Sequence, residues 1–447
     1  GLMTIASLLP QETTVNIIDM NINKLRKKDI EKADMVFVSA MIVQKESFKE
    51  VVALCNRLGV PVVAGGPYPT SNYENIEGVD HFVLHEGEVT LPLFLEDWKN
   101  SVPKRIYTAE VKPDITTAPV PRFDLINVRD YNTMPLQYSR GCPFNCDFCD
   151  IVALFGNKSR TKTEEQFIGE LQSLYDHGYR GSIFVVDDNF IGNKKSVKGM
   201  LRSLKTWQEQ YEFPFTFFTE ASVNLAEDDE LLDLMIETGF NMVFLGIETP
   251  ELKCLEEMNK GQNMRTDMKE SIHKLESKGM HVTGGFIIGF DSDPENIFEA
   301  QVRFIRELSI PTAMIGLLHA LPGTKLYQRL AKQGRLLTDS TGNNTDGTDL
   351  NFIPKIPMDR LIEGYHWVLA NVYHPKNYFD RCLAVLRRFP KTRNNTGGRK
   401  LISVYNVLGL INSVFRQTFS SYGWHYVRYL VKAFRTNSKA FVDIFTL

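Results

Sequence analysis

A short stretch of the chain places three cysteines close enough together to bind one metal centre. It runs Arg140-Gly-Cys142-Pro-Phe-Asn-Cys146-Asp-Phe148-Cys149-Asp, so half of the six cysteines fall within one short loop. Thiolates are soft ligands, and a loop with three of them suits an iron–sulfur cluster better than a hard cation. Three ligands leave one corner of the cluster open, where an iron can bind and activate a small molecule.

Other interpretations of the cysteines are a zinc site, a redox thiol cluster and a structural cluster in a binding or electron-transfer protein. A zinc site needs a fourth Cys or His nearby, and His85 and His177 are far away in the sequence. A structural cluster is expected to have a fourth cysteine ligand. Cys55, Cys254 and Cys382 instead fall in helical patterns, where a buried apolar role is the better interpretation.

With an aromatic residue before its last cysteine, the loop resembles the C-x3-C-x-aromatic-C signature of the radical S-adenosylmethionine (SAM) enzymes. The resemblance implies that Cys142, Cys146 and Cys149 hold a [4Fe–4S] cluster and that Phe148 lies beside the SAM site. It implies that SAM chelates the open iron and that one electron cleaves it to methionine and a 5′-deoxyadenosyl radical, which abstracts hydrogen from an unactivated carbon. It also implies an electron donor of the flavodoxin or ferredoxin type.

The first hundred or so residues alternate between strand and helix patterns. Helices are predicted at Lys45–Leu58 and from Glu88 to Trp98, and buried strands at Val15–Asp19, Met35–Ser39, Val60–Ala64 and His81–His85. This alternation predicts a doubly wound, Rossmann-like parallel sheet, which binds ligands at the carboxyl ends of its strands. Small residues there let a bulky ligand approach the backbone. The candidate ligand-binding residues at these ends are Asp19, Ser39, Gly65, Gly66, Pro67 and Gly87.

Together with the cysteine loop, this part resembles the cobalamin-binding domain of the cobalamin-dependent radical SAM enzymes. The resemblance rests on Ala64-Gly65-Gly66-Pro67 and Gly87-Glu88, and it implies cobalamin at the strand ends named above. Many cobalamin proteins carry D-x-H-x-x-G, whose His ligates cobalt, whereas this chain reads Asp19-Met-Asn-Ile-Asn-Lys. Cobalamin is therefore expected to bind without a histidine from that loop. A vestigial domain that holds no cofactor is the alternative.

From Leu136 to about Tyr327 the strand–helix rhythm resumes. Strands are predicted at Leu136–Ser139, Ser182–Val186, Phe215–Glu220, Met242–Ile247, His281–Ile288 and Ala313–Leu318. Six such strands, with the cysteine loop after the first, resemble the partial (β/α)6 barrel of the radical SAM proteins. In barrels of this kind the chemistry gathers at the C-terminal ends of the strands.

Polar residues and glycines stand at these strand ends, against an otherwise apolar background. An amino acid head group, a ribose diol and an adenine need such a mixture of carboxylates, hydroxyls and exposed backbone. By resemblance, Asp187 and Asp188 meet the SAM amino group, Glu220, Ser222 and Glu248 lie near its ribose and carboxylate, and Gly285 to Gly289 lie near its adenine. For any single carboxylate, a helix cap or a salt bridge is the alternative.

Basic residues are concentrated in two places. Arg160 and Lys162 follow the cysteine loop and could meet the SAM carboxylate or an anionic substrate, with a solvated basic turn as the alternative. From Lys376 onward there are thirteen Lys or Arg against two acids, although the whole chain carries a net charge of −3. This tail interleaves basic and aromatic residues, as around Trp424, which predicts an amphipathic helix on a membrane surface. A helix packed on the protein and a nucleic-acid-binding segment are alternatives, but no recognition motif supports the second, and nucleic acid is not expected.

Four parts of the chain are expected: the cobalamin-binding domain at 1–115, a linker at 116–135, the barrel at 136–330 and a mainly helical part at 331–447. Helices are predicted at Met358–Val372 and Tyr378–Phe389 in the last part. Its sequence pattern of loops and helices resembles that of the subgroup that includes hopanoid methylases. Because the chain begins at Gly1, directly in an amphipathic pattern, a short preceding piece of the first domain is expected.

The cellular compartment is predicted from the apolar segments and the cysteines of the sequence. There is no run of about twenty apolar residues and no signal peptide pattern. Cysteines gathered at a ligand loop indicate a reducing compartment. The expected location is the cytoplasm, with peripheral contact at the inner membrane surface if the tail binds lipid.

The function that the resemblance implies is methylation of an unactivated carbon. One SAM would supply the radical, and methylcobalamin would deliver the methyl group before a second SAM remethylates it. The basic aromatic tail favours a small-molecule substrate of the lipid or isoprenoid kind. Oxidation, ring contraction or cyclisation with the same cofactors and without methyl transfer is the alternative.

Overall fold

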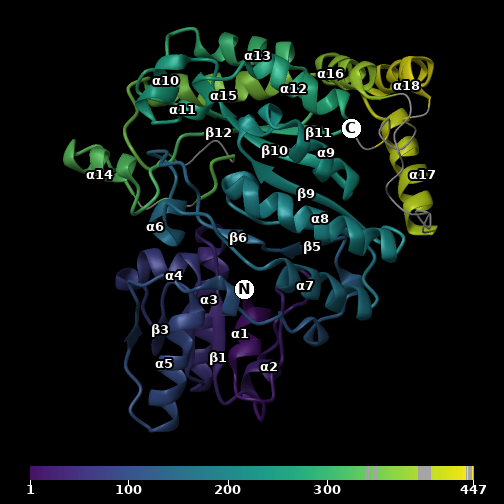
Figure 1. The fold of residues 1–447 in the computed structure, drawn as a ribbon. Coiled ribbons are helices and arrows are strands. Elements are labelled where there is room, and N and C mark those ends of the chain that lie inside the picture. Colours follow the sequence, from purple (N-terminus) through teal and green to yellow (C-terminus); the bar gives the residue numbers. More distant parts are fainter. Residues whose placement is uncertain are drawn as a thin grey trace.

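The computed structural model describes residues 1–338, 340, 342–345, 350–390, 404–438, 440 and 445. Figure 1 shows an N-terminal sheet with its helices, in purple and blue, against a larger sheet with its helices, in teal and green. The last helices of the chain, in yellow, lie at the side of the larger unit. The predicted α/β fold class is confirmed, because both sheets are parallel and helices cover them.

The N-terminal sheet has helices on both faces. Its strands are β1 (Val36–Ser39), β2 (Val62–Gly65), β3 (His81–Val83) and β4 (Ile106–Tyr107), in the order β1-β2-β3-β4. Successive side chains of a strand point to opposite faces. Val62 and Ala64 therefore pack with α3 (Lys45–Leu58), whereas Val63 packs with α1 (Leu2–Leu8) and α5 (Gly87–Lys99). The shorter helices of this part are α2 (Lys27–Glu31) and α4 (Pro67–Asn72).

The predicted strand at Val15–Asp19 is wrong. These residues form no strand, and their side chains are half-buried or exposed. The Tyr131 hydroxyl, from the segment that joins the two sheets, donates a hydrogen bond to Asp19 Oδ2 at 3.1 Å. A short apolar run becomes a strand only where a neighbouring strand pairs with its backbone, and the sequence pattern does not report that partner.

The larger sheet contains six parallel strands in the order β12-β11-β10-β9-β8-β5. They are β5 (Thr133–Leu136), β8 (Gly181–Val185), β9 (Phe215–Ala221), β10 (Phe240–Glu248), β11 (His281–Ile288) and β12 (Ala313–Leu317). All six overlap the predicted strands, but the first ends earlier than predicted. After it, β6 (Ser139–Arg140) pairs antiparallel with β7 (Arg160–Thr161) and brackets the cysteine loop.

Helices cover one face of this sheet and share a single core with it. These are α7 (Glu164–Asp176), α8 (Lys194–Gln210), α9 (Asp229–Glu237), α12 (Met268–Ser277) and α13 (Ile297–Leu308). Thr163 and Gln166 form a capping box at the start of α7. Short helices α6 (Ile151–Phe155), α10 (Leu252–Glu257), α11 (Gly261–Met264) and α14 (Lys325–Lys332) lie in the connections.

The C-terminal helices are α15 (Met358–Val372), α16 (Pro375–Arg388), α17 (Val404–Thr418) and α18 (Gly423–Asn437). The predicted helix at Met358–Val372 has the bounds of α15. The predicted helix at Tyr378–Phe389 lies within α16 except for its last residue. The rings of Phe379 and Tyr429 stack at 5.0 Å, which joins α16 to α18. None of the described helices is long and apolar enough to cross a membrane.

Candidate functional site

The three cysteines lie on the loop between β6 and α6, whose base is held by two aspartates. Asp187 accepts hydrogen bonds from the backbone N–H groups of Tyr138 and Ser139 at 2.7 and 2.8 Å. Asp188 accepts one from Gly141 at 3.0 Å, just before the first cysteine. Burial raises the pKa of Asp187 to about 7, although these hydrogen bonds lower it. Contact of the two carboxylates with SAM stays a prediction, whereas their contact with the loop is observed.

The three thiols lie near one another on this loop, since the charges of Cys142 and Cys146 both act on Cys149. Among the described residues, no three Cys, His, Asp or Glu side chains are placed so that they could hold a metal ion. Burial raises the pKa of all three thiols, that of Cys149 to about 12, and the other two thiols add to the increase at Cys149. The thiols are therefore protonated, and cluster assembly must release protons from them.

Two side-chain amides donate hydrogen bonds to cysteine sulfurs. Asn189 Nδ2 lies 3.8 Å from Cys142 Sγ, and Gln262 Nε2 lies 3.7 Å from Cys146 Sγ. The backbone N–H of Ser222 donates to Asn189 Oδ1 at 3.2 Å, which turns the amide nitrogen toward sulfur. N–H donors around sulfur stabilise thiolate ligands and cluster sulfides. The thiols of this loop, two of which accept a hydrogen bond from a side-chain amide, therefore fit a [4Fe–4S] cluster.

We expect Asn189→Leu to lower the reduction potential of the cluster, because the lost N–H donor no longer offsets negative charge on sulfur. A redox titration followed by electron paramagnetic resonance measures this. Asn259→Gly is the matched control, because the Asn259 amide contacts the backbone oxygen of Asn145 in the same loop and no sulfur. Equal shifts in both variants would mean that loop position and not the contact with sulfur sets the potential.

A buried ion pair lies beside the cysteine loop. The Lys260 ammonium contacts Glu248, and both side chains are about nine-tenths buried. Lys260 also lies 5.6 Å from the centre of the Phe148 ring. Glu248 follows a bulge in β10 and has φ of 68°, so the backbone is bent where this carboxylate leaves the strand. No recognised motif contains Lys260, Gln262 or Asn189, so none of the three is among the predicted site residues.

The residues predicted to bind SAM gather at the C-terminal edge of the six-stranded sheet. Glu220 pairs in register with Phe244, and Gly246 with Gly285. Burial, and then the charge of Asp188, raise the pKa of Glu220 to about 7. Gly289 has φ of 107° and donates its N–H to Asp293 at 2.7 Å. The structure therefore brings strand ends and cysteine loop together, and the contacts of each residue with SAM stay predictions.

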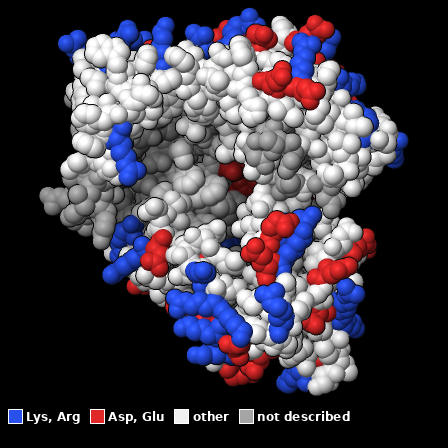
Figure 2. Space-filling view, turned by 180° about the vertical axis from the view of Figure 1, so that it is seen from behind, with Lys and Arg blue, Asp and Glu red and all other residues white. Residues whose placement is uncertain are grey.

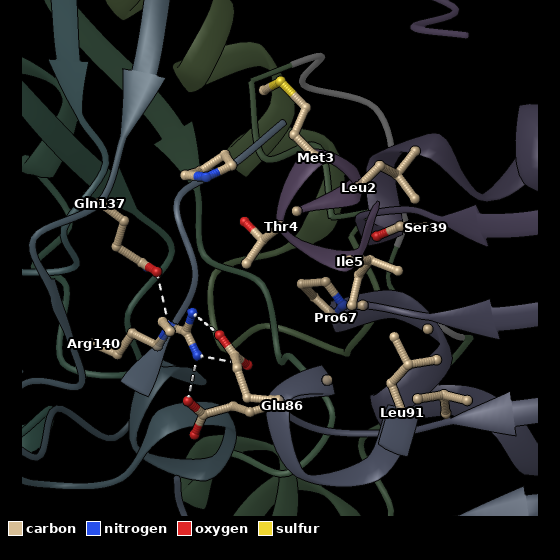
Figure 3. Close-up of a pocket in the computed structure, with 18 of the residues that line it drawn as sticks. Leu2, Met3, Thr4, Ile5, Ser39, Pro67, Glu86, Leu91, Gln137 and Arg140 are labelled. Carbon is tan, nitrogen blue, oxygen red and sulfur yellow. Dashed lines mark hydrogen bonds and ion pairs between the residues drawn. The ribbon is translucent and has the colours of Figure 1, made fainter. Parts of the chain in front are cut away.

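A cavity of about 340 Å³ lies between the N-terminal sheet and the barrel. In Figure 3, Ser39, Pro67 and Leu91 lie on one side of it, and Gln137 and Arg140 on the other. Five of the residues predicted to bind cobalamin line this cavity: Ser39, Gly65, Gly66, Pro67 and Gly87. Asp19 is not among them, because the loop that contains it turns to Tyr131.

The walls of this cavity fit a ligand that carries amide groups, as cobalamin does. Gly66 has φ of 88°, and a Cβ there would lie 2.4 Å from Ser39 Oγ. A side chain is therefore excluded at this position, and the backbone is accessible to a ligand. Nδ1 of His85 is buried without a hydrogen-bond partner in the described part of the chain. Burial lowers the pKa of this imidazole, which is therefore neutral. Backbone groups at strand ends and an unpaired nitrogen are available for such a ligand.

Charged residues join the cavity wall to the cysteine loop. Arg140 pairs with Glu86 at 2.7 Å and with Glu88 at 2.6 Å, and Arg160 pairs with Glu86 at 2.7 Å. Lys162 pairs with Glu170, and both are buried. Arg160 and Lys162 are therefore not a solvated turn, since both are engaged in internal ion pairs. The network connects the loop after β3 to the β6–β7 hairpin.

The network makes stability dependent on pH. Burial raises the pKa of Glu88, but the hydrogen bonds and charge of Arg140 outweigh it and hold this pKa below its usual value. A depressed carboxyl pKa stabilises the fold above the usual pKa, and this contribution is lost as pH falls through the folded value. We expect Glu88→Gln to flatten the fall of the melting temperature on acidification below about pH 4.5. An unchanged slope in thermal unfolding would contradict this.

Family profiles match three consecutive parts of the chain. Residues 1–95 match the B12 binding domain, residues 136–305 the radical SAM superfamily, and residues 324–447 a domain of unknown function. An uncharacterised methyltransferase of Synechocystis sp. is 44% identical over 85% of this chain and 72% of its own length. The hopanoid C-2 methylase of Rhodopseudomonas palustris is 36% identical over the same shares.

The chain belongs to the cobalamin-binding radical SAM methyltransferases. It is an enzyme of this family, whose cofactors are a [4Fe–4S] cluster, SAM and cobalamin, as the sequence predicted. The radical SAM methyltransferase TsrM of Kitasatospora setae, solved with cobalamin and a [4Fe–4S] cluster, has a TM-score of 0.61 over 80% of this chain and 86% of its own. The cobalamin-dependent radical enzyme OxsB has a TM-score of 0.59 over 93% of this chain and 73% of its own. At 16% and 14% identity, these two show a shared fold.

Proposed function

We propose that this enzyme methylates an unactivated carbon of a small lipid or isoprenoid-like molecule. The observation that supports it most is that one cavity contains both Gly66, on the cobalamin side, and Arg140, two residues before the first cysteine. A methyl donor on one wall and a radical-generating centre behind the other can then act on one substrate. When bound, the cluster with SAM supplies one-electron chemistry at a C–H bond, and cobalamin supplies the methyl group.

The residues of the chain would position these groups and exclude water. Asp187 and Asp188 hold the cysteine loop, and the amides of Asn189 and Gln262 contact its sulfurs. Burial and the charge of Asp188 raise the pKa of Glu220 to about 7, so this carboxyl can hold a proton near neutral pH. We further propose the domain boundaries 1–115, 116–135, 136–330 and 331–447.

The test is an anaerobic assay of the enzyme with a reconstituted cluster and hydroxocobalamin, reduced by flavodoxin. After removal of unbound ligand, the visible spectrum measures retained cobalamin. Formation of both S-adenosylhomocysteine and 5′-deoxyadenosine, with a methylated product in lipid extracts, is the expected result. Retained cobalamin with 5′-deoxyadenosine alone would instead indicate oxidation, ring contraction or cyclisation.

The surface of α17 and α18 supports peripheral contact with a membrane. Large apolar side chains are exposed there, among them Phe415 at 63%, Phe419 at 75% and Trp424 at 76%. From 404 to 438 the sequence has four Lys or Arg and no acid. Exposed aromatic rings flanked by cations match the boundary between anionic head groups and acyl chains. One face of α18 packs on α16, so the face that carries the exposed apolar side chains is the one left for lipid.

Flotation with vesicles tests the membrane contact. The enzyme is expected to float with vesicles of phosphatidylglycerol and phosphatidylcholine and to stay behind with phosphatidylcholine alone. Trp424→Ser with Phe419→Ser should abolish flotation, whereas Trp98→Ser, a 41% exposed tryptophan on α5, should leave it intact. Equal flotation of the unchanged enzyme, the double variant and Trp98→Ser would contradict the assignment. If the unchanged enzyme is a dimer and the double variant a monomer, a second copy of the chain covers this face.

A further inference from the structure

Both ends of the cysteine loop reach the cavity between the N-terminal sheet and the barrel. Arg140 lies two residues before Cys142, and Leu154 and Phe155 are the last two residues of α6, which begins two residues after Cys149. All three of these flanking residues line the cavity. The thiols are therefore bracketed along the chain by two parts of the cavity wall. A shift of the loop would change the shape of the cavity.

A tight neck, formed by residues 140–142 and 156–160, joins the two flanks of the loop. Arg140 on β6 pairs with Arg160 on β7, and the backbone N–H of Cys142 donates to the carbonyl oxygen of Gly156 at 3.4 Å. Gly141 has φ of 88°, and a Cβ there would lie 2.8 Å from this same oxygen. The two backbones are therefore in direct contact, with room only for a glycine between them. One flank cannot shift without the other.

The neck is attached to the N-terminal domain at several points. Glu86, on the loop between β3 and α5, pairs with both Arg140 and Arg160 at 2.7 Å. On the other flank, the Lys112 ammonium donates a hydrogen bond to the backbone oxygen of Leu154. The loop after β3 also carries Gly87, one of the residues predicted to bind cobalamin. The same network therefore fixes the cysteine loop and the cavity wall.

These ion pairs differ from the charges on the outer surface. Figure 2 shows acidic and basic side chains side by side there, where water screens their attraction. In the neck, by contrast, only 12% of the Arg140 side chain, 20% of Arg160 and 3% of Glu86 are exposed. Buried pairs are screened far less, and separating one leaves an uncompensated charge in the interior. The position of the neck is therefore tied to that of the loop after β3.

We propose that the cysteine loop couples the two cofactors, so that a bound cluster strengthens cobalamin binding and bound cobalamin strengthens retention of the cluster. A cluster held by three thiols fixes the loop and, through the neck, both flanks. Cobalamin then binds to a wall that is already ordered, and less conformational freedom is lost on binding. The effect must be reciprocal, because one coupling free energy acts on both ligands. The inference rests on the proposed function for the place of cobalamin.

The coupling is measured as a ratio of two dissociation constants. The anaerobic enzyme is titrated calorimetrically with hydroxocobalamin, once with the cluster reconstituted and once stripped of iron. Binding is expected to be about tenfold tighter with the cluster, within the usual range of coupling between two sites. The melting temperature verifies that the iron-free form is folded. A second measurement starts from the loaded enzyme: saturating hydroxocobalamin should raise the amount of iron that is retained against a ferrous chelator.

Two variants separate the coupling from direct contact with the ligand. Among the described residues, neither Arg160 nor Lys112 lines the cavity, yet both attach the neck to the N-terminal domain. Arg160→Met and Lys112→Met should therefore assemble the cluster but bring the two dissociation constants close together. Lys104→Met is the matched control, because Lys104 is 72% exposed and pairs with Asp97 on α5. It should keep the tenfold ratio.

Equal dissociation constants with and without the cluster would overturn the coupling and leave the cobalamin site in place. A ratio that Arg160→Met and Lys112→Met both preserve would overturn the role given to the neck. If the loaded enzyme binds no hydroxocobalamin, the proposed function loses its methyl donor and the coupling fails with it. Coupled binding without formation of S-adenosylhomocysteine would uphold the coupling and contradict the methyl transfer.

Discussion

Cys142→Ala, Cys146→Ala and Cys149→Ala are each expected to abolish cluster assembly and, with it, all cleavage of SAM. With two thiols remaining on the loop, neither the three-point attachment nor the open fourth iron can form. Iron content, visible absorption and 5′-deoxyadenosine after reduction measure the result. Loss should be complete, because the one-electron cleavage of SAM needs a cluster to supply the electron.

A buried cysteine outside the loop is the control for these three variants. Cys55 on α3 is fully buried, so Cys55→Ala removes a thiol and leaves a small cavity without touching the loop. It should lower the melting temperature slightly and retain iron and SAM cleavage. Persistent 5′-deoxyadenosine formation by any loop variant would refute the assignment of the cluster ligands.

Arg140→Met is expected to destabilise the enzyme by about 3–5 kcal/mol, the usual effect of removing one partner of a buried ion pair. Glu86 is 3% and Glu88 10% exposed at the side chain, so two carboxylates would remain in the interior. Arg160 would still pair with Glu86, whereas Glu88 would lose the salt bridge described for it. Cobalamin retention should fall as well, because Arg140 lines the same cavity. Thermal unfolding and the spectrum of bound cobalamin are the measurements.

The exposed pair Arg122–Asp124 provides the comparison. Both side chains are 44% exposed, so solvent screens the pair and Arg122→Met should leave the melting temperature nearly unchanged. If Arg140→Met behaves like Arg122→Met, the interdomain network contributes nothing to stability. If it loses stability but keeps cobalamin, the network joins the domains without shaping the cobalamin cavity.

Local patterns in the sequence predicted most of the elements. The helix at Lys45–Leu58 was predicted with its observed bounds, because its apolar residues recur at helical spacing and Gly59 at its end adopts φ of 68°. The six barrel strands were found because each is an apolar run between turn signals. Val15–Asp19 has the same kind of pattern but no pairing strand, and a pattern of apolar residues cannot distinguish the two cases.

The sequence by itself identified the cofactors and predicted the cluster ligands, because ligand spacing within one loop and strand–helix rhythm are local properties. Tertiary structure alone decided which charges meet. Arg140 and Glu86 are 54 residues apart, and Lys260 reaches Phe148 across more than a hundred residues. It also decided which face of the six-stranded sheet packs against helices. Side-chain alternation only separates two faces, whereas the placement of helices determines which face is covered.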